Sequence, residues 1–293
     1  MSQETAAEDI WTVRRVIAWA TEDLKKRGAS APRLEVELLL GLVVKLDRVG
    51  LIIDAERPLS KLELGAYRAL HQRRRAGEPV AYLLGTREFY GRPFRVDKRV
   101  LIPRPDTEIL VEVALRRTKH VSLSARVLDL CTGSGCVAIT LSRERPTTTV
   151  TGVDISTDAL AVSHENAIRL GAVTVAFLRS DLFSALDPAR DRFDLITANP
   201  PYIAEGEIPT LAVDIRKFEP KLALSGGDDG LDLVRRIARD APRFLTEGGV
   251  LAMEIGSEQA AATSRLFEEA GFVDIEVQKD YGGHDRVVSG RRG

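Results

Sequence analysis

The sequence has few of the residues that build covalent or metal-bound frameworks. Only two of its 293 residues are cysteines, Cys131 and Cys136, and its four histidines show no metal-ligand spacing. These counts exclude a disulfide scaffold and a zinc site made of cysteines, and we expect no metal. We interpret both cysteines as reduced thiols.

Long apolar runs and an excess of one charge are missing as well. Hydrophobic residues make up 44% and aromatic residues 5% of the chain, yet no run approaches the roughly 20 residues of a membrane span. The formal net charge is −1, so no global basic field points to a nucleic-acid partner. The start MSQETAAEDIW is acidic and lacks an apolar core. We therefore expect no signal peptide, no membrane partner and a cytoplasmic protein.

The patterns that are present divide the chain into three segments. Residues 1–77 read as helices only, because apolar side chains recur at helical spacing. Residues 78–103 are punctuated by glycine and rich in β-forming residues, which predicts a hairpin-like connector. Residues 104–293 carry the remaining motifs and form a third, larger segment.

Two features make the helical prediction specific. Leu34, Leu38, Leu42 and Leu46 lie four residues apart and predict the buried face of one helix. Ser60 and Glu63 have the spacing of a capping box, which predicts that another helix begins directly after Ser60. Residues 1–77 contain no recognisable cofactor motif, so we assign substrate recognition to this small all-helical domain.

In the third segment, strand and helix patterns alternate. The expected strands are 125–130, 148–154, 173–178, 193–198, 248–255, 272–279 and 284–290. Helices are expected near 106–119, 135–144, 157–170, 230–242 and 258–270. This alternation predicts an α/β fold with a mostly parallel, Rossmann-like sheet covered by helices on both faces. The tight link DYGG at 280–283 predicts that the last two strands form an antiparallel hairpin.

A glycine loop and an acid follow the first two of these strands. The strand ARVLDL breaks into CTGSG, where Gly133 and Gly135 let backbone N–H groups approach a ligand at a helix start. Asp154 ends the second strand about 20 residues later, where a carboxylate can accept hydrogen bonds from ribose hydroxyls. Loop and acid together indicate a nucleoside-containing cofactor. They leave a dinucleotide and S-adenosylmethionine both open.

The third strand is followed by Asp181 and Leu182, in the stretch FLRSDLF. An adenine bound at this strand end would be contacted by an acid or a backbone N–H, with Leu182 and Phe183 as apolar neighbours. A single acid after a strand is also a commonplace loop residue, so its position alone does not decide between the two interpretations.

The fourth strand ends in Asn199-Pro200-Pro201-Tyr202, since consecutive prolines cannot donate to a β-ladder. A stiff turn is the simpler interpretation. In the alternative, the Asn199 side-chain oxygen and the Pro200 carbonyl accept the hydrogens of a planar –NH₂ group, and Tyr202 packs on its planar face. Acceptors that favour the pyramidal, charge-developing nitrogen stabilise the transition state more than the ground state. Such a site requires neither a metal nor a general base.

VLDLCTGSG, VTGVD and NPPY together resemble the class I S-adenosylmethionine-dependent methyltransferases of planar amino groups. Further motifs are YLLGTREFYGRPFRV, VLIPRPDTEILVE, FEPKLALSGGDDGL, LAMEIGSEQ and KDYGGHDRVVSG. With the helical amino-terminal segment, they make nearly the whole chain similar to the release factor glutamine methyltransferases, the PrmC/HemK family. The resemblance implies S-adenosylmethionine as cofactor and N5-methylation of the glutamine in the Gly-Gly-Gln motif of class I peptide chain release factors.

The resemblance also implies roles for individual residues. The implied cofactor-binding residues are Arg104, Glu108, Cys131, Thr132, Gly133, Ser134, Gly135, Asp154, Asp181, Leu182 and Asn199. The implied catalytic and substrate-binding residues are Asn199, Pro200, Pro201 and Tyr202, and Glu254 is expected nearby at a strand end. Cys131 stands where this family often has glycine, and Asp106 where it often has glutamate. A positive φ at Cys131 would strain the loop.

Two other enzyme classes share parts of this pattern. A nucleic-acid methyltransferase acting on adenine or cytosine amino groups uses the same NPPY chemistry, but the near-neutral charge and the lack of an obvious basic insertion count against it. A nicotinamide oxidoreductase would leave NPPY and the terminal hairpin unexplained. We expect release factors as protein partners, no direct nucleic-acid partner, and a monomer.

Overall fold

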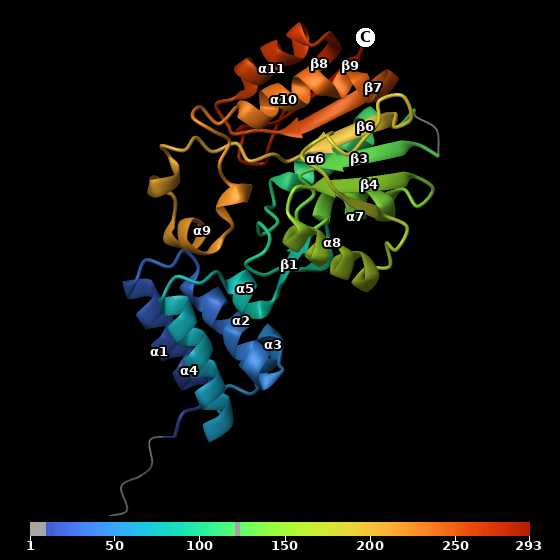
Figure 1. The fold of residues 1–293 in the computed structure, drawn as a ribbon. Helices are drawn as coiled ribbons and strands as arrows, with labels where there is room; N and C mark the ends of the chain where they lie inside the picture. Colours follow the sequence, from blue (N-terminus) through green and yellow to red (C-terminus); the bar gives the residue numbers. More distant parts are fainter. Residues whose placement is uncertain (1–9, 121–123) are drawn as a thin grey trace, which may run out of the picture. The chain divides into compact units, whose positions relative to one another are not determined.

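The computed structural model describes residues 10–120 and 124–293 and divides the chain after Gly85 into two units (Figure 1). The first unit contains helices, and the second contains the large sheet. The division falls later than residue 77 because Val80–Leu84 forms one more helix, α5, which belongs to the first unit.

The first unit is a bundle of helices with regular ends. Its helices are α1 (Val13–Lys26), α2 (Pro32–Val44), α3 (Arg48–Ile53), α4 (Lys61–Arg75) and α5 (Val80–Leu84). Ser60 and Glu63 form the predicted capping box at the start of α4, in which each satisfies a backbone N–H that the helix leaves without a partner.

The buried face of α2 differs from the prediction. Leu34 and Leu42 are 40% and 47% exposed, whereas Val36, Leu39 and Leu40 are fully buried. The segment LEVELLLGLVV is apolar on nearly every side, so a four-residue spacing fits more than one face of the helix. Contacts with the other helices select the face that is buried.

A small antiparallel hairpin opens the second unit. Its strands are β1 (Thr86–Phe89) and β2 (Arg92–Arg95). Phe89 and Phe94 are fully buried with their rings 6.0 Å apart, edge to face. They share a core with α6 and α7, so the hairpin is anchored to the sheet domain by its aromatic side chains.

A seven-stranded sheet in the order β5-β4-β3-β6-β7-β9-β8 forms the centre of the second unit. Its strands are β3 (Arg126–Leu130), β4 (Thr149–Asp154), β5 (Ala176–Arg179), β6 (Phe193–Ala198), β7 (Leu245–Glu254), β8 (Phe272–Lys279) and β9 (Asp285–Arg292). The strands β5, β4, β3, β6 and β7 pair in parallel, whereas β9 is antiparallel to both β7 and β8. The predicted mostly parallel sheet with an antiparallel C-terminal hairpin is confirmed.

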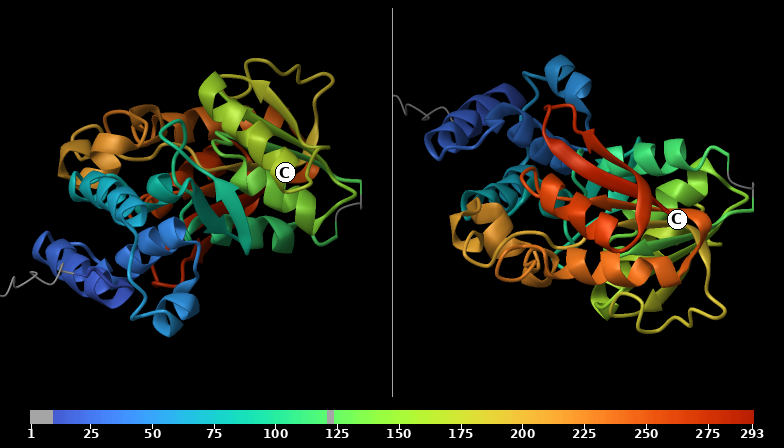
Figure 2. Two further views of the ribbon diagram at one scale, coloured as in Figure 1. Left: turned by 90° about the horizontal axis from the view of Figure 1, so that it is seen from below. Right: turned by 90° about the horizontal axis from the view of Figure 1, so that it is seen from above.

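Helices cover both faces of this sheet. They are α6 (Thr107–Arg117), α7 (Cys136–Glu144), α8 (Thr157–Arg169), α10 (Asp232–Asp240) and α11 (Ala260–Glu269). The short helix α9 (Val213–Phe218) buries no residue and lies in the segment between β6 and α10, and 3₁₀ turns occur at Ile208–Thr210, Lys221–Ala223 and Ala241–Arg243. One apolar core joins the sheet to α10 and α11, and another joins it to α6 and α7. Figure 2 shows the green and the orange helices on different sides of the strands. Among the described residues, no helix combines the length and the apolar character that crossing a membrane requires.

The carboxyl ends of the parallel strands meet at one edge of the sheet. The chain order reverses at β3, because β4 pairs with one side of it and β6 with the other. In open α/β sheets, ligands bind in the crevice at such a reversal. The topology therefore brings the loop after β3 and the NPPY stretch after β6 to the same place.

Candidate active site

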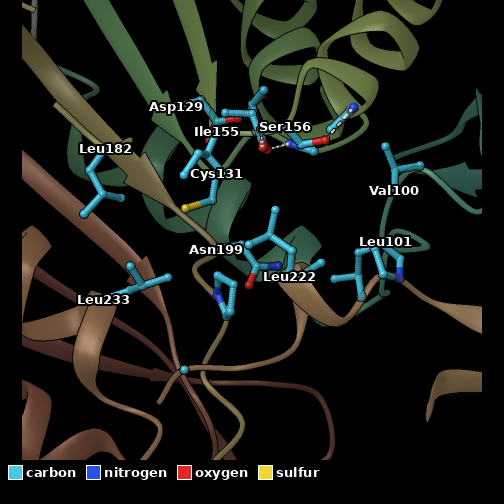
Figure 3. Close-up of a pocket in the computed structure, with 18 of the residues that line it drawn as sticks. Val100, Leu101, Asp129, Cys131, Ile155, Ser156, Leu182, Asn199, Leu222 and Leu233 are labelled. Carbon is cyan, nitrogen blue, oxygen red and sulfur yellow. Dashed lines mark hydrogen bonds between the residues drawn. The ribbon is translucent and has the colours of Figure 1, made fainter. Parts of the chain in front are cut away.

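A cavity of about 730 Å³ lies at this edge of the sheet (Figure 3). Figure 3 shows Leu182 and Leu233 on one side of it, Val100 and Leu101 on the opposite side, and Asn199 between them. Its walls combine apolar side chains with many polar and charged groups, arginines and aspartates among them. This combination is typical of small-molecule sites.

Most of the residues that the sequence singled out meet in this cavity. It is lined by Arg104, Cys131, Thr132, Gly133, Ser134, Asp154, Asp181, Leu182, Asn199 and Pro201. Glu108, Gly135, Pro200 and Tyr202 do not line it. The structure thus joins the glycine loop, the acid after β4 and the asparagine after β6 around one space, as expected for two ligands that react with each other.

The glycine loop and Asp154 are bonded directly to each other. One carboxylate oxygen of Asp154 accepts the N–H of Gly133 at 2.9 Å, and the other accepts the N–H of Ser156 at 2.9 Å. Burial raises the pKa of Asp154, and the backbone donors around it oppose that shift. A carboxylate has about four lone-pair positions, so Asp154 keeps acceptor capacity for a ligand beside these backbone donors.

Cys131 adopts the left-handed conformation, with φ 55°. This conformation costs a non-glycine residue on the order of 1–2 kcal/mol. The sequence analysis expected strain in the loop if φ at Cys131 were positive, and φ is positive here. Leu182 shares the feature, with φ 50°, and both residues line the cavity. Such conformations persist where the surrounding structure determines them strongly, and they cluster at ligand sites.

Asp129 lines the cavity, although the sequence reasoning gave it no role. Its carboxylate accepts hydrogen bonds from the hydroxyls of Thr132 at 2.6 Å and Thr197 at 2.8 Å. Burial raises the pKa of Asp129 to about 6. These bonds tie the end of β3 to the glycine loop and to β6. A charged residue inside the apolar strand RVLDL was the signal that could have revealed it.

Asp181 lies in an ion pair at the rim of the cavity. Both of its carboxylate oxygens accept from one nitrogen of Arg236 on α10, each at 2.9 Å. The sequence predicted this helix near 230–242 but not its contribution of Leu233 and Arg236 to the cavity wall. Leu182 and Leu233 supply the apolar surface on this side, so the wall suits a flat aromatic group.

Asn199 is held by a residue far away in the sequence. Its amide nitrogen donates to the Thr107 hydroxyl at 3.2 Å, and Thr107 itself is buried at the start of α6. The Asn199 nitrogen is thereby engaged, and its side-chain oxygen remains available as an acceptor in the cavity.

The backbone of the NPPY stretch is locked by a glycine-rich loop. A Cβ on Gly226 would lie 2.8 Å from the Pro201 carbonyl, and one on Gly230 would lie 2.4 Å from the Tyr202 carbonyl. The Gln259 amide donates to the Tyr202 carbonyl at 2.9 Å. Only glycine permits this approach, which explains the motif SGGDDG and keeps the NPPY backbone rigid.

Tyr202 and Glu108 face other parts of the protein. The Tyr202 hydroxyl lies 3.5 Å from a carboxylate oxygen of Glu254, and burial raises the pKa of Tyr202 to about 12. Glu108 accepts the N–H of Tyr90 at 2.8 Å and so fastens the β1–β2 hairpin. In this conformation Tyr202 and Glu108 do not line the cavity. The stacking of Tyr202 on a substrate and the contact of Glu108 with a cofactor therefore stay predictions.

Arg104 lines the cavity and forms a partly buried ion pair with Glu219, whose own side chain is buried. It donates to Glu219 at 2.7 Å, and Glu219 also accepts the N–H of Ile102 at 3.3 Å. Burial raises the pKa of Glu219, and the charge of Arg104 opposes this. The pair connects the loop before α6 to the segment after α9, and both segments contribute cavity walls.

The fold and the site define a class I methyltransferase. A methyltransferase from Pyrococcus furiosus has a similar structure, with a TM-score of 0.52 at 14% identity, covering 77% of this chain and 98% of that one. At this identity the likeness supports the fold alone. The family model for the methyltransferase small domain matches residues 105–216, and that for the PrmC N-terminal domain matches residues 15–85.

Curated relatives match over the full length. The release factor glutamine methyltransferase of Geobacter sulfurreducens is 45% identical and covers 99% of this chain and 100% of its own. The protein of the same name from Vibrio cholerae is 41% identical and covers 96% of each chain. The chain belongs to the release factor glutamine methyltransferase family.

Proposed function

We propose that this protein methylates the side-chain amide nitrogen (N5) of the glutamine in the Gly-Gly-Gln motif of class I peptide chain release factors, with S-adenosylmethionine as methyl donor. The observation that carries the proposal is the meeting of Asn199 with Asp154 and the glycine loop in one cavity. Full-length identity to relatives of that name supports the substrate.

The cavity fits the donor at several points. Asp154 retains acceptor capacity for ribose hydroxyls, and the glycine loop offers backbone close to a charged methionine end. Leu182 and Leu233 border the side where an adenine would lie. When bound, S-adenosylmethionine supplies a methyl group that its sulfonium already activates.

The protein's own residues act chiefly on the glutamine amide. An amide nitrogen is a poor nucleophile because its lone pair is delocalised into the carbonyl. We expect the Asn199 oxygen to accept one amide hydrogen and to favour the pyramidal nitrogen that carries developing positive charge. The Pro200 carbonyl, which lies outside the cavity lining in this conformation, stays the predicted second acceptor. When the N–CH₃ bond forms and the S–CH₃ bond breaks, the sulfur would keep the electron pair and leave as the thioether S-adenosylhomocysteine, and the nitrogen would release one proton to water.

The test is mass spectrometry of a purified release factor incubated with this protein and S-adenosylmethionine. We expect a gain of one methyl group on the motif glutamine, and no gain when that glutamine is replaced by asparagine. Parallel reactions with RNA and DNA examine the nucleic-acid alternative. Methylation of nucleic acid without methylation of the release factor would contradict the proposal.

The helical unit is proposed to hold the intact release factor in the cytoplasm, where translation ends. Its short helix α3 exposes Ile52 by 68% and Ile53 by 77%, beside Val49 at 62%. Replacing Ile52 and Ile53 together by glutamate should raise the KM for intact release factor by about thirtyfold or more, the effect of losing an interface hot spot of at least about 2 kcal/mol. The KM for a short Gly-Gly-Gln peptide should not change. An equal effect on both substrates would assign α3 to stability instead.

A further inference from the structure

The side chain of Asn166 connects two segments of the cavity wall that are far apart in the sequence. Asn166 belongs to α8 and is fully buried, with 0% of its surface exposed. Its amide contacts Arg95, the last residue of β2, and Ser134 of the glycine loop. Ser134 itself lines the cavity, and so do residues 99–101, which follow β2. One buried amide therefore joins the cofactor loop to a second part of the wall.

At Arg95 the Asn166 amide takes the place of a neighbouring strand. The Arg95 N–H donates to Asn166 Oδ1 at 2.7 Å, and Asn166 Nδ2 donates to the Arg95 carbonyl at 3.0 Å. A side-chain amide carries the same donor and acceptor as a peptide group, so it can pair with both backbone groups of one strand residue. The backbone that leads into residues 99–101 is thereby fixed where it leaves the β1–β2 hairpin.

The second hydrogen of the same amide holds the glycine loop. Asn166 Nδ2 donates to the Ser134 carbonyl at 2.9 Å. A turned amide would place its –NH₂ group against the Arg95 N–H and its oxygen against two carbonyls, so only one orientation fits. The helix also packs directly on the loop, because a Cβ on Gly135 would lie 3.1 Å from the Cβ of Ser163, one turn before Asn166.

The bond to Ser134 matters because a glycine follows it. Gly135 has φ 79°, and glycine adopts positive and negative φ with similar ease, so the peptide between Ser134 and Gly135 can rotate at little cost. Its N–H donates to the Thr132 carbonyl at 2.8 Å, within the loop itself. Asn166 holds the carbonyl end from outside the loop. Without Asn166, the loop would keep its bond to Asp154 but lose its attachment to β2.

We propose that Asn166 is a positioning residue for methyl transfer, which fixes the cofactor loop to the segment after β2 and so couples cofactor binding to the wall formed by residues 99–101. The inference rests on the proposed function for the identity of cofactor and substrate. Asn166 lies outside the cavity lining, so it acts through Ser134 and Arg95. A ligand that orders the loop also orders the backbone at Arg95, because the same amide is bonded to both.

Hydrogen exchange of the unmodified protein tests this coupling. Residues 90–97 lie outside the cavity lining, so a ligand in the cavity does not cover their amides directly. We expect S-adenosylmethionine to slow exchange in peptides that span residues 90–97 by about threefold or more. In Asn166→Ala, the cofactor should leave these peptides unchanged. The wild-type measurement needs no substitution, so it decides even if a variant does not fold. Unchanged exchange at saturating cofactor overturns the inference.

Two substitutions remove the hydrogen bonds of this amide in different ways. Asn166→Ala leaves space behind, whereas Asn166→Leu fills the space without offering a donor or an acceptor. Both should lower kcat on release factor by about tenfold at saturating cofactor, because small displacements of reacting groups are costly. Cofactor affinity in calorimetry should change by less than about threefold, since Asp154 still holds the loop at Gly133. A purely structural role predicts lower thermal stability without this loss of kcat.

The matched control is Ser163→Ala on the same helix. Ser163 is also fully buried, and its hydroxyl donates to the Leu160 carbonyl at 2.8 Å within α8. The substitution therefore removes a buried hydrogen bond, but it leaves the bonds of Asn166 in place. We expect its kcat within about twofold of wild type, because the lost bond is local to the helix. If kcat of Asn166→Ala and Asn166→Leu is no lower than that of Ser163→Ala, the inference is wrong.

A signal of the ligand-free protein separates this inference from the proposed function. The amide nitrogen of Gly135 belongs to the peptide whose carbonyl accepts from Asn166, so its ¹⁵N shift should change in Asn166→Ala and stay in Ser163→Ala. If release factor is not methylated but S-adenosylmethionine slows exchange at residues 90–97, the substrate proposal fails and the coupling stands. A Gly135 signal that is the same in wild type and Asn166→Ala overturns the inference.

Discussion

The two ends of the cavity are held in different ways. At one end, Asp154 is bonded to the backbone N–H groups of Gly133 and Ser156 on neighbouring strand ends. At the other, Asn199 is bonded to a side chain 92 positions away, and the Tyr202 carbonyl to Gln259, which is 57 positions away. Backbone donors are present whatever the side chain, whereas side-chain donors are lost by a single substitution.

This difference assigns different tasks to the two ends. The Asp154 end should control how tightly the cofactor binds and should tolerate changes in neighbouring side chains. The Asn199 end should control the rate of methyl transfer and should be sensitive to substitutions outside the cavity. Variants that move one quantity without the other therefore test the comparison directly.

Asn199→Ala should give the largest effect. It removes a fixed acceptor from the transition state, so turnover should fall on the order of 10²–10³, while cofactor affinity changes little. Asn199→Asp should keep more activity, because it still accepts a hydrogen bond but introduces a charge that must be desolvated. Single-turnover methylation measures both, with circular dichroism as the control for folding. An alanine variant within about threefold of wild type is too active for this role.

Asp154→Ala should chiefly weaken cofactor binding rather than slow methyl transfer. Loss of hydrogen bonds to a charged group costs about 1.5–3 kcal/mol, which corresponds to roughly 10–150-fold weaker cofactor binding in calorimetry. Since the pKa of Asp154 is raised, wild-type affinity should fall with decreasing pH before an ordinary aspartate would protonate, and the alanine variant should lack this dependence. Unchanged affinity in a folded variant would rule the assignment out.

Gln259→Ala probes the side-chain-held end from outside the cavity lining. It leaves the Tyr202 and Gly230 carbonyls without the donor they now share at 2.9 and 3.3 Å. The NPPY backbone should loosen and turnover should fall about tenfold, because small displacements of reacting groups are costly. Cofactor affinity, measured in the same calorimetric assay, should stay within twofold. If affinity falls as much as turnover, the two ends are not independent.

Asp181→Ala should have the smallest effect. Its carboxylate is occupied by Arg236, and exposed ion pairs contribute about 0–1 kcal/mol. We expect cofactor affinity within about threefold of wild type, with Leu182 providing the contact on this side. A loss greater than tenfold would mean that Asp181 exchanges Arg236 for the adenine when the cofactor binds.

The comparison also explains which parts of the site the sequence predicted. The glycine loop and Asp154 follow adjacent parallel strands, so alternation of strands and glycine spacing were enough to bring them together. The same logic placed Asn199 at the neighbouring strand end. The resemblance also led to the expectation that Glu254 lies nearby, and the Tyr202 hydroxyl lies 3.5 Å from its carboxylate. Thr107 and Gln259 carry no comparable local signal as partners of this stretch, because each is an ordinary polar residue at the start of a helix.

Other features that the sequence did not predict also depend on contacts between elements far apart in the chain. The buried face of α2 was wrong because an apolar helix has several equivalent faces until its neighbours select one. The contribution of α10 to the cavity wall was missed because Leu233 and Arg236 lie far in sequence from the strands they face. Both the buried face of α2 and the place of α10 at the cavity are set by tertiary contacts, which the local sequence pattern does not reveal.

By itself, the sequence determined the sheet, the cofactor loop with its acid, and the presence of an amide beside two prolines, because strand alternation and backbone geometry are local properties. Only the tertiary structure decided which way that amide is turned. Hydrogen-bond direction depends on the partners that packing brings alongside, and here α6 supplies the Thr107 hydroxyl to the Asn199 amide at the end of β6. The role of a side chain depends on its hydrogen-bond partners, and tertiary packing determines which partners lie within reach.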